Sequence, residues 1–482
     1  MVVIRSEKDT PESTEVVVVG AGPTGLLLAG DLATAGVPVT VLERRTEESN
    51  LTRAFAVHAR TLEELDARGV ADEVIASGHR VEGLRAFGKV QIHLGDLPTR
   101  FPYVLITPQY NVERVLAARA VRAGAVIVRG ARLESIAQDT EGVDASYSMG
   151  GLVRKIRGQY LVGADGHHST VRQALGLDFP GESVVSSLML ADVLLAKEPS
   201  ELLTIEANSH GFCFIVPYGD GWYRVIARDP HNPKPDSASV TLDEIARVAK
   251  KVLGTDYEMH DPRWMSRFHS EERQVEDYQV ERVFLAGDAA HVHSPAGGMG
   301  MNTGLQDAAN LGWKLAAKVH GRGDFRLLVS YQDERHPIGE KVLKLSGGLI
   351  RGALVRSPVS RAVRNTVARG ALGAPRVGDR LRGRLSGIGL RYDAPANTHR
   401  KVGTRAVDVM GTDGRRLYEA LRHGRFVLVS PPGVEVSAGD RDHVDVLPVA
   451  EGEGVLVRPD GYVGWVAGGP EELHDALWRW GA

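Results

Sequence analysis

The hydrophobic positions near the start of the chain pass from a continuous apolar run to a helical pattern across a glycine-rich turn. Four valines at residues 16–19 run directly into Gly20-Ala21-Gly22-Pro23-Thr24-Gly25, and a leucine-rich run over residues 26–32 follows. A short apolar run that ends at glycine is typical of a buried strand, and the run after it favours a helix. A second apolar run, residues 37–42, ends at Glu43. The pattern predicts strand, tight turn, helix and strand, which is how an α/β domain begins.

The residues of this turn match the backbone requirements of a dinucleotide-binding loop. Gly20 permits the tight turn, Gly22 lets a pyrophosphate approach the backbone, and Gly25 lets helix and strand pack closely. The helix start presents unpaired N–H groups to the phosphates, and Pro23 lies in the first turn, where a missing N–H costs little. Glu43 follows Gly25 by 18 positions, close to the spacing at which an acid meets a ribose hydroxyl. The alternative is a glycine-rich turn in an ordinary α/β domain, which we disfavour because the strand–helix–strand setting is the one that the motif requires.

Two more acidic residues follow predicted strands in glycine-framed turns. The apolar residues 160–162 lead into Gly163-Ala164-Asp165-Gly166, and Ser169 is placed to cap the helix that follows. Residues 282–286 lead in the same way into Gly287-Asp288, after which the glycine-rich loop 295–304 precedes a helix over about 305–318. Ligands of open α/β sheets bind at the carboxyl ends of strands, and a helix start favours anions. Each acid taken alone also fits an ordinary turn.

The middle of the chain has a different pattern. Residues 81–103 and about 180–270 read as mainly β, and a helix is predicted over 241–253. From residue 351 to 391 arginines dominate, and Asp379 is the only acid. Because no aromatic residues are interleaved with them, we interpret this stretch as a solvated helix face and connector rather than a nucleic-acid site.

The tail restarts as a separate α/β unit at about residue 393. Three apolar runs predict strands there, at residues 426–429, 445–449 and 455–457. Asp460-Gly461 is a hairpin signal. A last helix is predicted from apolar residues at positions 473, 476, 477 and 480, which share one helical face.

Composition narrows the class of protein. The 482 residues are enough for about three domains, and a net charge of −3 suggests neither nucleic acid nor an anionic membrane as a partner. Cys213 is the only cysteine, so no disulfide forms within the chain, which fits a reducing cytoplasm; its apolar neighbours indicate a buried site. Neither a signal peptide nor a membrane-spanning run is expected. His291 and His293 stand two positions apart without a clear carboxylate partner, which is poor evidence for a metal, and we predict none.

The three glycine-framed motifs, in this order along one chain, resemble those of the single-component FAD-dependent aromatic hydroxylases, the class A or para-hydroxybenzoate hydroxylase class. The resemblance covers roughly residues 15–370. The run from Leu456 to Trp465, which reads LVRPDGYVGW, looks like the end of the thioredoxin-like C-terminal domain of phenol hydroxylases and actinobacterial polyketide hydroxylases. With one cysteine in the chain, a redox Cys-x-x-Cys pair is excluded there, so we interpret that domain as structural.

The resemblance implies an α/β multi-domain fold in three parts. A Rossmann-like FAD-binding domain would comprise residues 1–180 and 271–390, with 81–104 joining the sheet of the next domain. Residues 181–270 would form a substrate-binding β-sheet domain. Residues 391–482 would form the thioredoxin-like domain.

The resemblance also assigns cofactor roles. The first glycine motif would cradle the FAD pyrophosphate and Glu43 would bind the adenosine ribose. Asp165 belongs to a motif linked to both FAD and NAD(P)H, and Asp288 would bind the ribityl chain. Met299 departs from the family, where many members have glutamine. The complete set implied for cofactor binding is Gly20, Gly22, Pro23, Thr24, Gly25, Glu43, Arg44, Arg53, Gln109, Asp165, Gly287, Asp288, Pro295, Gly298, Gly300, Met301 and Asn302.

The activity implied is that of an FAD-dependent monooxygenase that uses NADPH or NADH and O2. Through a C4a-hydroperoxyflavin it would hydroxylate an aromatic small molecule, with a polycyclic polyketide or antibiotic-like scaffold favoured. Alternatives are Baeyer–Villiger-type or drug-inactivating oxygenation, and, from another class, an FAD-binding NAD(P)H reductase that transfers no oxygen. A monomer or homodimer is expected. No general base is assigned, and the candidates on the substrate side, each with a structural alternative, are His58, Tyr218, Tyr223 and Arg224.

Overall fold

The first valine run forms the middle of a parallel sheet. The computed structural model describes residues 10–48, 54–86, 90–324, 326–355, 357–435 and 443–482. Its first sheet has the order β18-β19-β12-β1-β2-β8, and only β18 runs antiparallel to its neighbour. The strands are β1 (Val16–Val19), β2 (Val39–Glu43), β8 (Val126–Arg129), β12 (Tyr160–Gly163), β18 (Gln279–Val280) and β19 (Val283–Leu285).

The register of this sheet brings the three glycine motifs together. Val19 of β1 lies beside Gly163 of β12, and Gly163 lies beside Leu285 of β19. Because these strands are parallel, the turns that follow them leave the same edge of the sheet. Motifs that are about 140 and 270 residues from the first in sequence therefore meet at one place.

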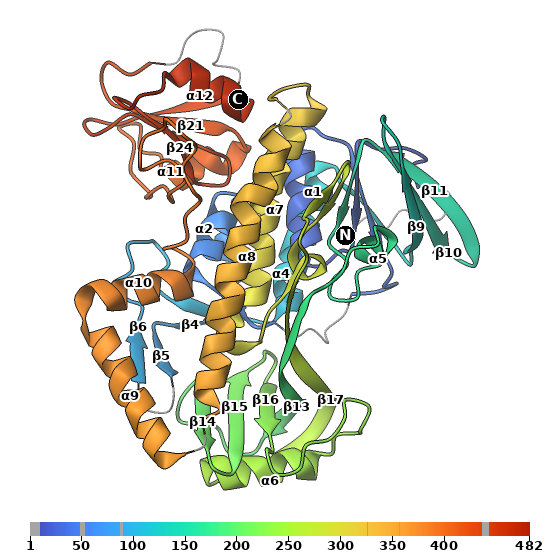
Figure 1. The fold of residues 1–482 in the computed structure, drawn as a ribbon, viewed down its shortest axis with the longest axis vertical. Helices are drawn as coiled ribbons and strands as arrows, with labels where there is room; N and C mark the ends of the chain where they lie inside the picture. Colours follow the sequence, from blue (N-terminus) through green and yellow to red (C-terminus); the bar gives the residue numbers. More distant parts are fainter. Residues whose placement is uncertain (1–9, 49–53, 87–89, 325, 356, 436–442) are drawn as a thin grey trace.

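Three helices form the layers next to this sheet. Helix α1 (Pro23–Thr34) packs against both α4 (Gln109–Ala123) and α7 (Met299–Val319). Figure 1 shows α1 between the sheet and α7. Pro108 precedes α4, and the helix predicted after the third motif is longer than expected, since it begins at Met299. The segments of chain that connect the strands of this sheet also form other elements. These are the helices α2 (Ala59–Asp66), α3 (Ala71–Ile75) and α5 (Thr170–Ala174), and a three-stranded sheet of β9 (Arg132–Gln138), β10 (Val143–Met149) and β11 (Leu152–Gly158).

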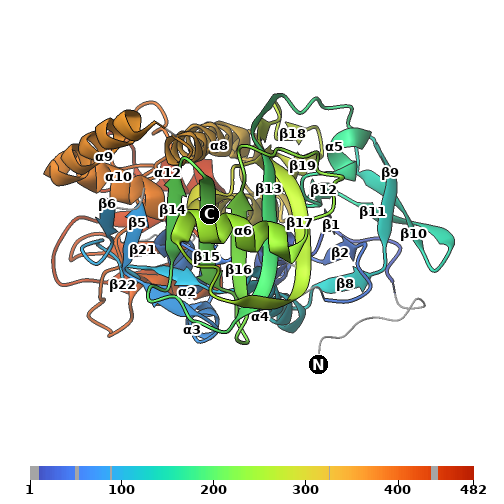
Figure 2. The same cartoon turned by 90° about the horizontal axis from the view of Figure 1, so that it is seen from below.

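The middle of the chain is mainly β, as predicted. Its sheet is antiparallel, with the order β14-β15-β16-β13-β17-β20. Helix α6 (Leu242–Leu253) covers one face, as Figures 1 and 2 show, and the Thr241 hydroxyl caps it by accepting the Glu244 N–H at 3.3 Å. The strands are β13 (Gly181–Leu195), β14 (Thr204–Asn208), β15 (Gly211–Pro217), β16 (Tyr223–Arg228), β17 (Met259–Gln274) and β20 (His291–Val292).

Residues 81–104 do not extend this sheet, which differs from our expectation. Strands β4 (His79–Val81) and β3 (Ala56–Val57) both pair with β7 (Val104–Ile106), while β5 (Gly83–Ala86) pairs with β6 (Val90–His93). The physical reason is the direction of their apolar side chains. Val81, Leu94, Leu97 and Val104 pack in the same hydrophobic cluster as Leu188 and Phe214, so this segment covers a face of the sheet instead of adding to its edge.

A long helix that the sequence did not reveal links the two sheets. Helix α8 (Arg326–Ala353) lies beside α7 and runs down to the antiparallel sheet of β13–β17 (Figure 1). Its sequence is rich in charge and contains Pro337, which masks the helical period, although Tyr331, Ile338 and Val342 are buried. The arginine-rich connector forms α9 (Pro358–Gly373), capped by Ser357, and α10 (Pro375–Ser386).

The tail forms a four-stranded sheet that pairs with none of the other described sheets. Its sheet has the order β22-β21-β23-β24, from strands β21 (Phe426–Ser430), β22 (Val444–Pro448), β23 (Val455–Val457) and β24 (Val463–Val466). Asp460 and Gly461 lie in the turn that joins β23 to β24, with α11 (Leu417–Ala420) and α12 (Leu473–Trp480) beside the sheet. Within the described residues, the structure contains no helix whose length and apolar content would let it cross a membrane.

Candidate functional site

The first glycine motif forms a cradle in which only one position is open. A Cβ atom on Gly25 would lie 2.0 Å from the Gly20 carbonyl oxygen, and one on Gly20 would lie 2.4 Å from that of Ala164. Gly20 also has a φ of 105°, which side-chain-bearing residues rarely adopt. A Cβ on Gly22, by contrast, would meet nothing within 4 Å. Gly20 and Gly25 are therefore required by packing, while Gly22 leaves the backbone at the start of α1 open to a ligand.

Glu43 closes one side of this cradle. Its carboxylate is buried and accepts the Ala21 N–H at 2.7 Å and the Arg45 N–H at 2.8 Å. Arg45 also donates its Nε to the same carboxylate at 3.1 Å, whereas the side chain of Arg44, the basic residue chosen from the sequence, is exposed. Adjacent residues at a strand end point in opposite directions, which places Arg45 against Glu43 and Arg44 toward solvent.

The first and third motifs touch through Thr24. Its hydroxyl oxygen lies 2.8 Å from where a Cβ on Gly287 would be and 2.5 Å from one on Gly304, so the threonine fills the space that both glycines leave. The Gly287 N–H donates to the Asp307 carboxylate at 3.0 Å, which fixes the turn that carries Asp288. The Asp288 carboxylate lies beside Gly300, 3.9 Å from the position of its absent Cβ.

The two histidines of the third motif have different surroundings. His291 is fully buried, and its Nε2 lies 2.6 Å from the Asp307 carboxylate. Burial by itself would raise the pKa of Asp307, but Arg335 and His291 hold that pKa well below its usual value. His293 lies beside Gly300, and both of its ring nitrogens are buried with no hydrogen-bond partner in the protein. In the described part of the chain, no three His, Cys, Asp or Glu side chains are grouped so that they could hold a metal ion.

Asp165 performs a local structural task. Its carboxylate accepts the Ser169 hydroxyl at 2.5 Å and the backbone N–H groups of Thr170 and Val171 at 2.7 and 3.2 Å. Ser169 caps α5, as expected, by accepting the Arg172 N–H at 3.0 Å. Burial raises the pKa of Asp165, and these hydrogen bonds to the ionised form oppose that rise. The second motif therefore meets the cradle through its backbone, where Ala164 contacts Gly20.

Asn302 joins the glycine-rich loop to the segment that carries His58. Its Oδ1 accepts the His58 N–H at 2.8 Å, and its Nδ2 donates to the carbonyls of Ala56 and Gly298 at 3.0 and 2.7 Å. Met301 packs against the main core, and Met299 is buried at the loop, with its Cε beside Gly297.

Gln109 stands at the first position of α4 and accepts the Ala54 N–H at 3.3 Å. It therefore orders the chain just after Arg53, which lies outside the described residues.

An apolar cavity of about 210 Å³ opens beside this loop. It lies between the antiparallel sheet of β13–β17 and α8, and His58 contributes the one titratable side chain among its described lining residues. The others are Phe55, Ala56, Ile92, Val104, Ile106, Leu188, Leu203, Ile205, Phe212, Phe214, Ile226, Pro295, Ala296, Gly297, Gly298, Leu349, Ile350, Ala353 and Leu385.

His58 is neutral in this setting. Its burial lowers its pKa to about 4, although the backbone of Gly297 and Leu385 stabilises the charged form in part. A neutral imidazole can donate one hydrogen bond and accept another. Of the four candidates chosen on the substrate side, His58 alone reaches the cavity.

The other three candidates lie elsewhere, for reasons of strand alternation and charge. Tyr223 points to the opposite face of the sheet, where it packs with the residues of α6. Arg224 is fully buried and forms a bidentate pair with Asp192 at 2.8 Å for both contacts, and its guanidinium stacks on Tyr218 at 3.6 Å from the ring centre. These residues form a rigid ionic and aromatic cluster beside the cavity instead of lining it.

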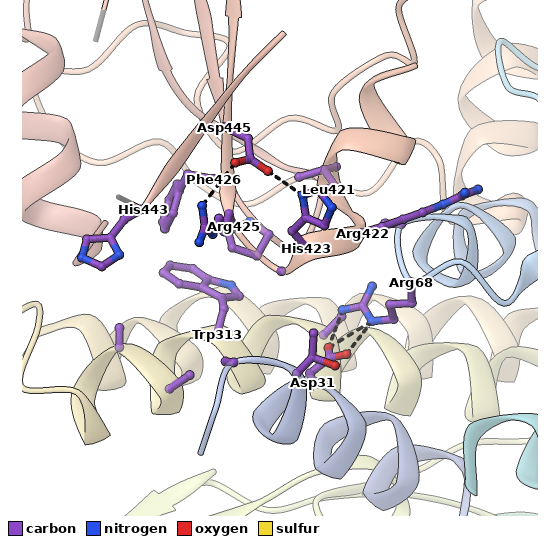
Figure 3. Close-up of a pocket in the computed structure, with 18 of the residues that line it drawn as sticks. Asp31, Arg68, Trp313, Leu421, Arg422, His423, Arg425, Phe426, His443 and Asp445 are labelled. Carbon is purple, nitrogen blue, oxygen red and sulfur yellow. Dashed lines mark hydrogen bonds and ion pairs between the residues drawn. The ribbon is translucent and has the colours of Figure 1, made fainter. Parts of the chain in front are cut away.

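A larger cleft lies away from these motifs, since none of the glycine-framed turns lines it. It measures about 980 Å³ and lies between the tail domain and the outer ends of α1 and α7. Figure 3 shows Asp31, Arg68 and Trp313 on one side, facing His423, Arg425 and Asp445 on the other. Arg68 pairs with Asp31 at 2.6 Å in this cleft, and the His423 ring lies 2.9 Å from the Asp445 carboxylate. Because no residue of the three glycine motifs lines this cleft, we look for the cofactor site at the glycine cradle instead.

A smaller cavity of about 380 Å³ adjoins the cradle at Ala21. Arg114, Arg129 and Arg263 line it together with Glu48 and Glu113. The Nε and Nη2 atoms of Arg263 are buried without a hydrogen-bond partner in the protein. An open glycine, a helix start and arginine donors at one place suit a dinucleotide pyrophosphate, so the residues present fit FAD.

Comparison with known proteins agrees with this site. A family model described as FAD binding domain matches residues 13–346, and one described as Aromatic-ring hydroxylase, C-terminal, matches residues 399–482. The fold and the cradle thus define an FAD-binding enzyme. The chain belongs to the FAD-dependent aromatic-ring hydroxylases and is a flavin-dependent monooxygenase.

Relatives match this chain over nearly its whole length. The rifampicin monooxygenase of Streptomyces venezuelae is 39% identical over 474 residues, which cover 97% of this chain and 98% of the relative. The structure of OxyS, an anhydrotetracycline hydroxylase from Streptomyces rimosus, has a TM-score of 0.86 at 34% identity and covers 97% of this chain and 99% of its own. CabE, an aromatic hydroxylase from angucycline biosynthesis, has a TM-score of 0.87 at 33% identity with the same coverage.

We predict that two alanine substitutions in the cradle separate folding from cofactor binding. Gly25→Ala forces a Cβ against the Gly20 carbonyl and should cost roughly 3 kcal/mol or more of unfolding free energy. Gly22→Ala meets no protein atom, so its apoprotein should melt within about 2 °C of the wild type while FAD binds at least about tenfold more weakly. Differential scanning calorimetry and flavin fluorescence titration measure the two effects. Equal FAD affinity of Gly22→Ala and wild type would contradict this assignment.

We also predict an acid instability that originates at His58. Its folded pKa of about 4 is below the unfolded value of 6.5, so the unfolded state binds more protons between these values and stability falls as the pH drops through this window. Replacing His58 by Gln should reduce the loss of unfolding free energy between pH 7 and pH 4.5 by roughly 2 to 3 kcal/mol. Urea denaturation at the two pH values measures it, and an identical loss in both proteins would rule out a buried neutral His58.

Proposed function

We propose that this monooxygenase hydroxylates an uncharged, fused-ring aromatic substrate held in the apolar cavity, with NADPH or NADH as the reductant. The observation that carries the proposal is the position of the cavity, whose wall includes Pro295, Gly297 and Gly298 of the glycine-rich loop. In the balanced reaction, substrate, O2, NAD(P)H and a proton give hydroxylated substrate, water and NAD(P)⁺. One atom of O2 enters the ring and the other leaves as water.

The cavity supports a flat apolar substrate. Phe212, Phe214 and Ile226 form its floor on the substrate sheet, and Leu349 and Ile350 of α8 form the opposite wall. Such walls exclude water, which protects reactive oxygen species from side reactions. No Lys or Arg is among the lining residues that the structure describes, so a substrate carboxylate would be buried without a partner. The relatives that act on anhydrotetracycline and on rifampicin, by their names, support a polycyclic scaffold.

The chain's own residues would divide the work. When bound, FAD supplies hydride acceptance and oxygen activation. The cradle around Gly22 would hold its pyrophosphate, the Asp288 carboxylate its ribityl hydroxyls, and the backbone from Pro295 to Asn302 its ring. The neutral imidazole of His58 would accept a hydrogen bond from a phenolic hydroxyl and so orient the ring that reacts. We propose a role in orientation for His58, because a pKa of about 4 makes it a weak base.

We expect a neutral polycyclic phenol to be preferred over its carboxylated analogue by at least about tenfold in kcat/KM, because burying an unpaired carboxylate costs several kcal/mol. The test is anaerobic reduction of the purified flavoprotein by NADPH or NADH, followed by oxygen, with matched pairs of such compounds. A product that is heavier by one oxygen supports the proposal, and nuclear magnetic resonance of the product separates ring hydroxylation from insertion beside a ketone. Release of hydrogen peroxide alone with every compound would support the reductase alternative, and preference for the carboxylated partner would overturn the substrate class.

A further inference from the structure

The turn between β23 and β24 of the tail domain penetrates the interface with the FAD-binding domain. Asp460 lies in this tight turn and carries a charged side chain, yet it is only 1% exposed. Its carboxylate accepts from Arg458 at 3.0 and 2.5 Å and from Asn310 of α7 at 3.1 Å. Its backbone carbonyl accepts from Arg60 of α2 at 2.6 Å. One residue of the tail therefore contacts two helices of another domain directly.

The first chain of contacts leads from this turn to the substrate cavity. Arg60 is fully buried, and besides Asp460 it contacts Glu63 at 3.0 Å and the Tyr418 hydroxyl at 2.9 Å. It lies two residues after His58, which is the N-cap of α2 and lines the cavity. Asn302 holds the His58 backbone from the other side. The position of His58 is thus fixed between Asn302, which follows the glycine-rich loop, and helix α2, which the tail contacts through Arg60.

The second chain of contacts leads to the third glycine motif. Arg458 forms a bidentate pair with Glu334 of α8, at 2.6 and 2.9 Å, and Glu334 also accepts from Lys314 of α7 at 2.8 Å. The next residue of α8, Arg335, donates to Asp307 at 2.7 Å. Asp307 in turn accepts the N–H of Gly287, which precedes Asp288. Every side chain along this path is buried, so each charge depends on its partner for stabilisation.

We propose that Asp460 is a positioning residue of the active site, through which the tail domain sets the geometry of the Gly287-Asp288 turn and of His58. This goes beyond our expectation that the tail is only structural. Arg458 and Asp460 tie α7, α8 and α2 to one rigid hairpin, and these helices carry Asp307, Arg335 and Arg60. The bidentate pairs of the Arg458 guanidinium with Asp460 and Glu334 fix direction as well as distance. Loss of one carboxylate would therefore let the helices shift relative to one another. Oxygen transfer requires a site that excludes water and holds its groups in a fixed geometry, so such shifts would favour release of hydrogen peroxide.

The test compares Asp460→Asn with Asp445→Asn. Among the described residues, Asp445 contacts His423 at 2.9 Å and Arg425 at 3.5 Å, both in the tail domain, so its substitution removes one carboxylate charge outside the proposed network (Figure 3). The readouts are the FAD dissociation constant, from flavin fluorescence, the share of oxidised NAD(P)H recovered as hydrogen peroxide, and the melting temperature. For Asp460→Asn we expect a rise of roughly tenfold in the dissociation constant and at least about threefold in the peroxide share. Asp445→Asn should leave both at wild-type values.

A melting temperature that falls in Asp460→Asn, with FAD affinity and peroxide share unchanged, would overturn the proposal and leave the hairpin a structural clamp. Arg60→Lys is the second variant should Asp460→Asn fail to fold. It keeps the charge beside Glu64 but loses the fork that reaches the Asp460 carbonyl, and a raised peroxide share is again the expected result. The peroxide readout rests on the proposed function. The FAD affinity does not, so a wild-type protein that forms no oxygenated product would refute that function while the comparison of FAD affinities still decides the role of Asp460.

Discussion

The close approach of β1, β12 and β19 at one sheet edge is the constraint on which the rest of the structure depends. Parallel pairing places Val19, Gly163 and Leu285 in one row, so three turns that are far apart in sequence emerge side by side. They can fit there only because side chains are absent where backbones touch, at Gly20 and Gly25, and because Thr24 fills the space at Gly287 and Gly304. The cofactor cradle is therefore a consequence of packing at this edge. Among the three glycines of the first motif, only Gly22 has open space where a side chain would be, so only there is the backbone accessible to a ligand.

A series of buried charged side chains connects this edge of the sheet to the tail domain. Asp307 orders the turn before Asp288, Arg335 holds Asp307, and the Arg458–Glu334 pair joins the same helix to the tail. A buried ion pair adds little net stability, because desolvation of both groups offsets their attraction, but it strongly resists any change in geometry. The apolar cavity differs from this arrangement. Its walls lie on a sheet and a helix, and the neutral imidazole of His58 is the one titratable side chain among its described lining residues.

Local sequence patterns predicted much of the parallel sheet, because its strands and turns depend on neighbours in the chain. The apolar run before each glycine motif, the cap at Ser169 and the Asp460-Gly461 turn all lie where the pattern placed them. The prediction was weaker where side-chain direction mattered. Arg45 holds Glu43 while Arg44 faces solvent, and Tyr218, Tyr223 and Arg224 belong to packing clusters outside the cavity. Helix α8 escaped notice since its apolar face is interrupted by charges that find partners only in the folded protein.

The sequence by itself predicted the class of this protein through a resemblance that rests on three glycine-framed motifs in a fixed order. A strand that ends in glycine and an acid at a given spacing are requirements that a short stretch of chain can satisfy. Tertiary structure decided what that chemistry can act on. The apolar cavity is built from β13–β16, α8 and α10, whose residues are not adjacent in sequence, and its shape depends on how a sheet and a helix approach each other. The same holds for the contacts of the tail domain with α2, α7 and α8. A buried charge reveals its partner only when long-range packing brings the two together, as it does for Asp460 and Arg60 across 400 positions.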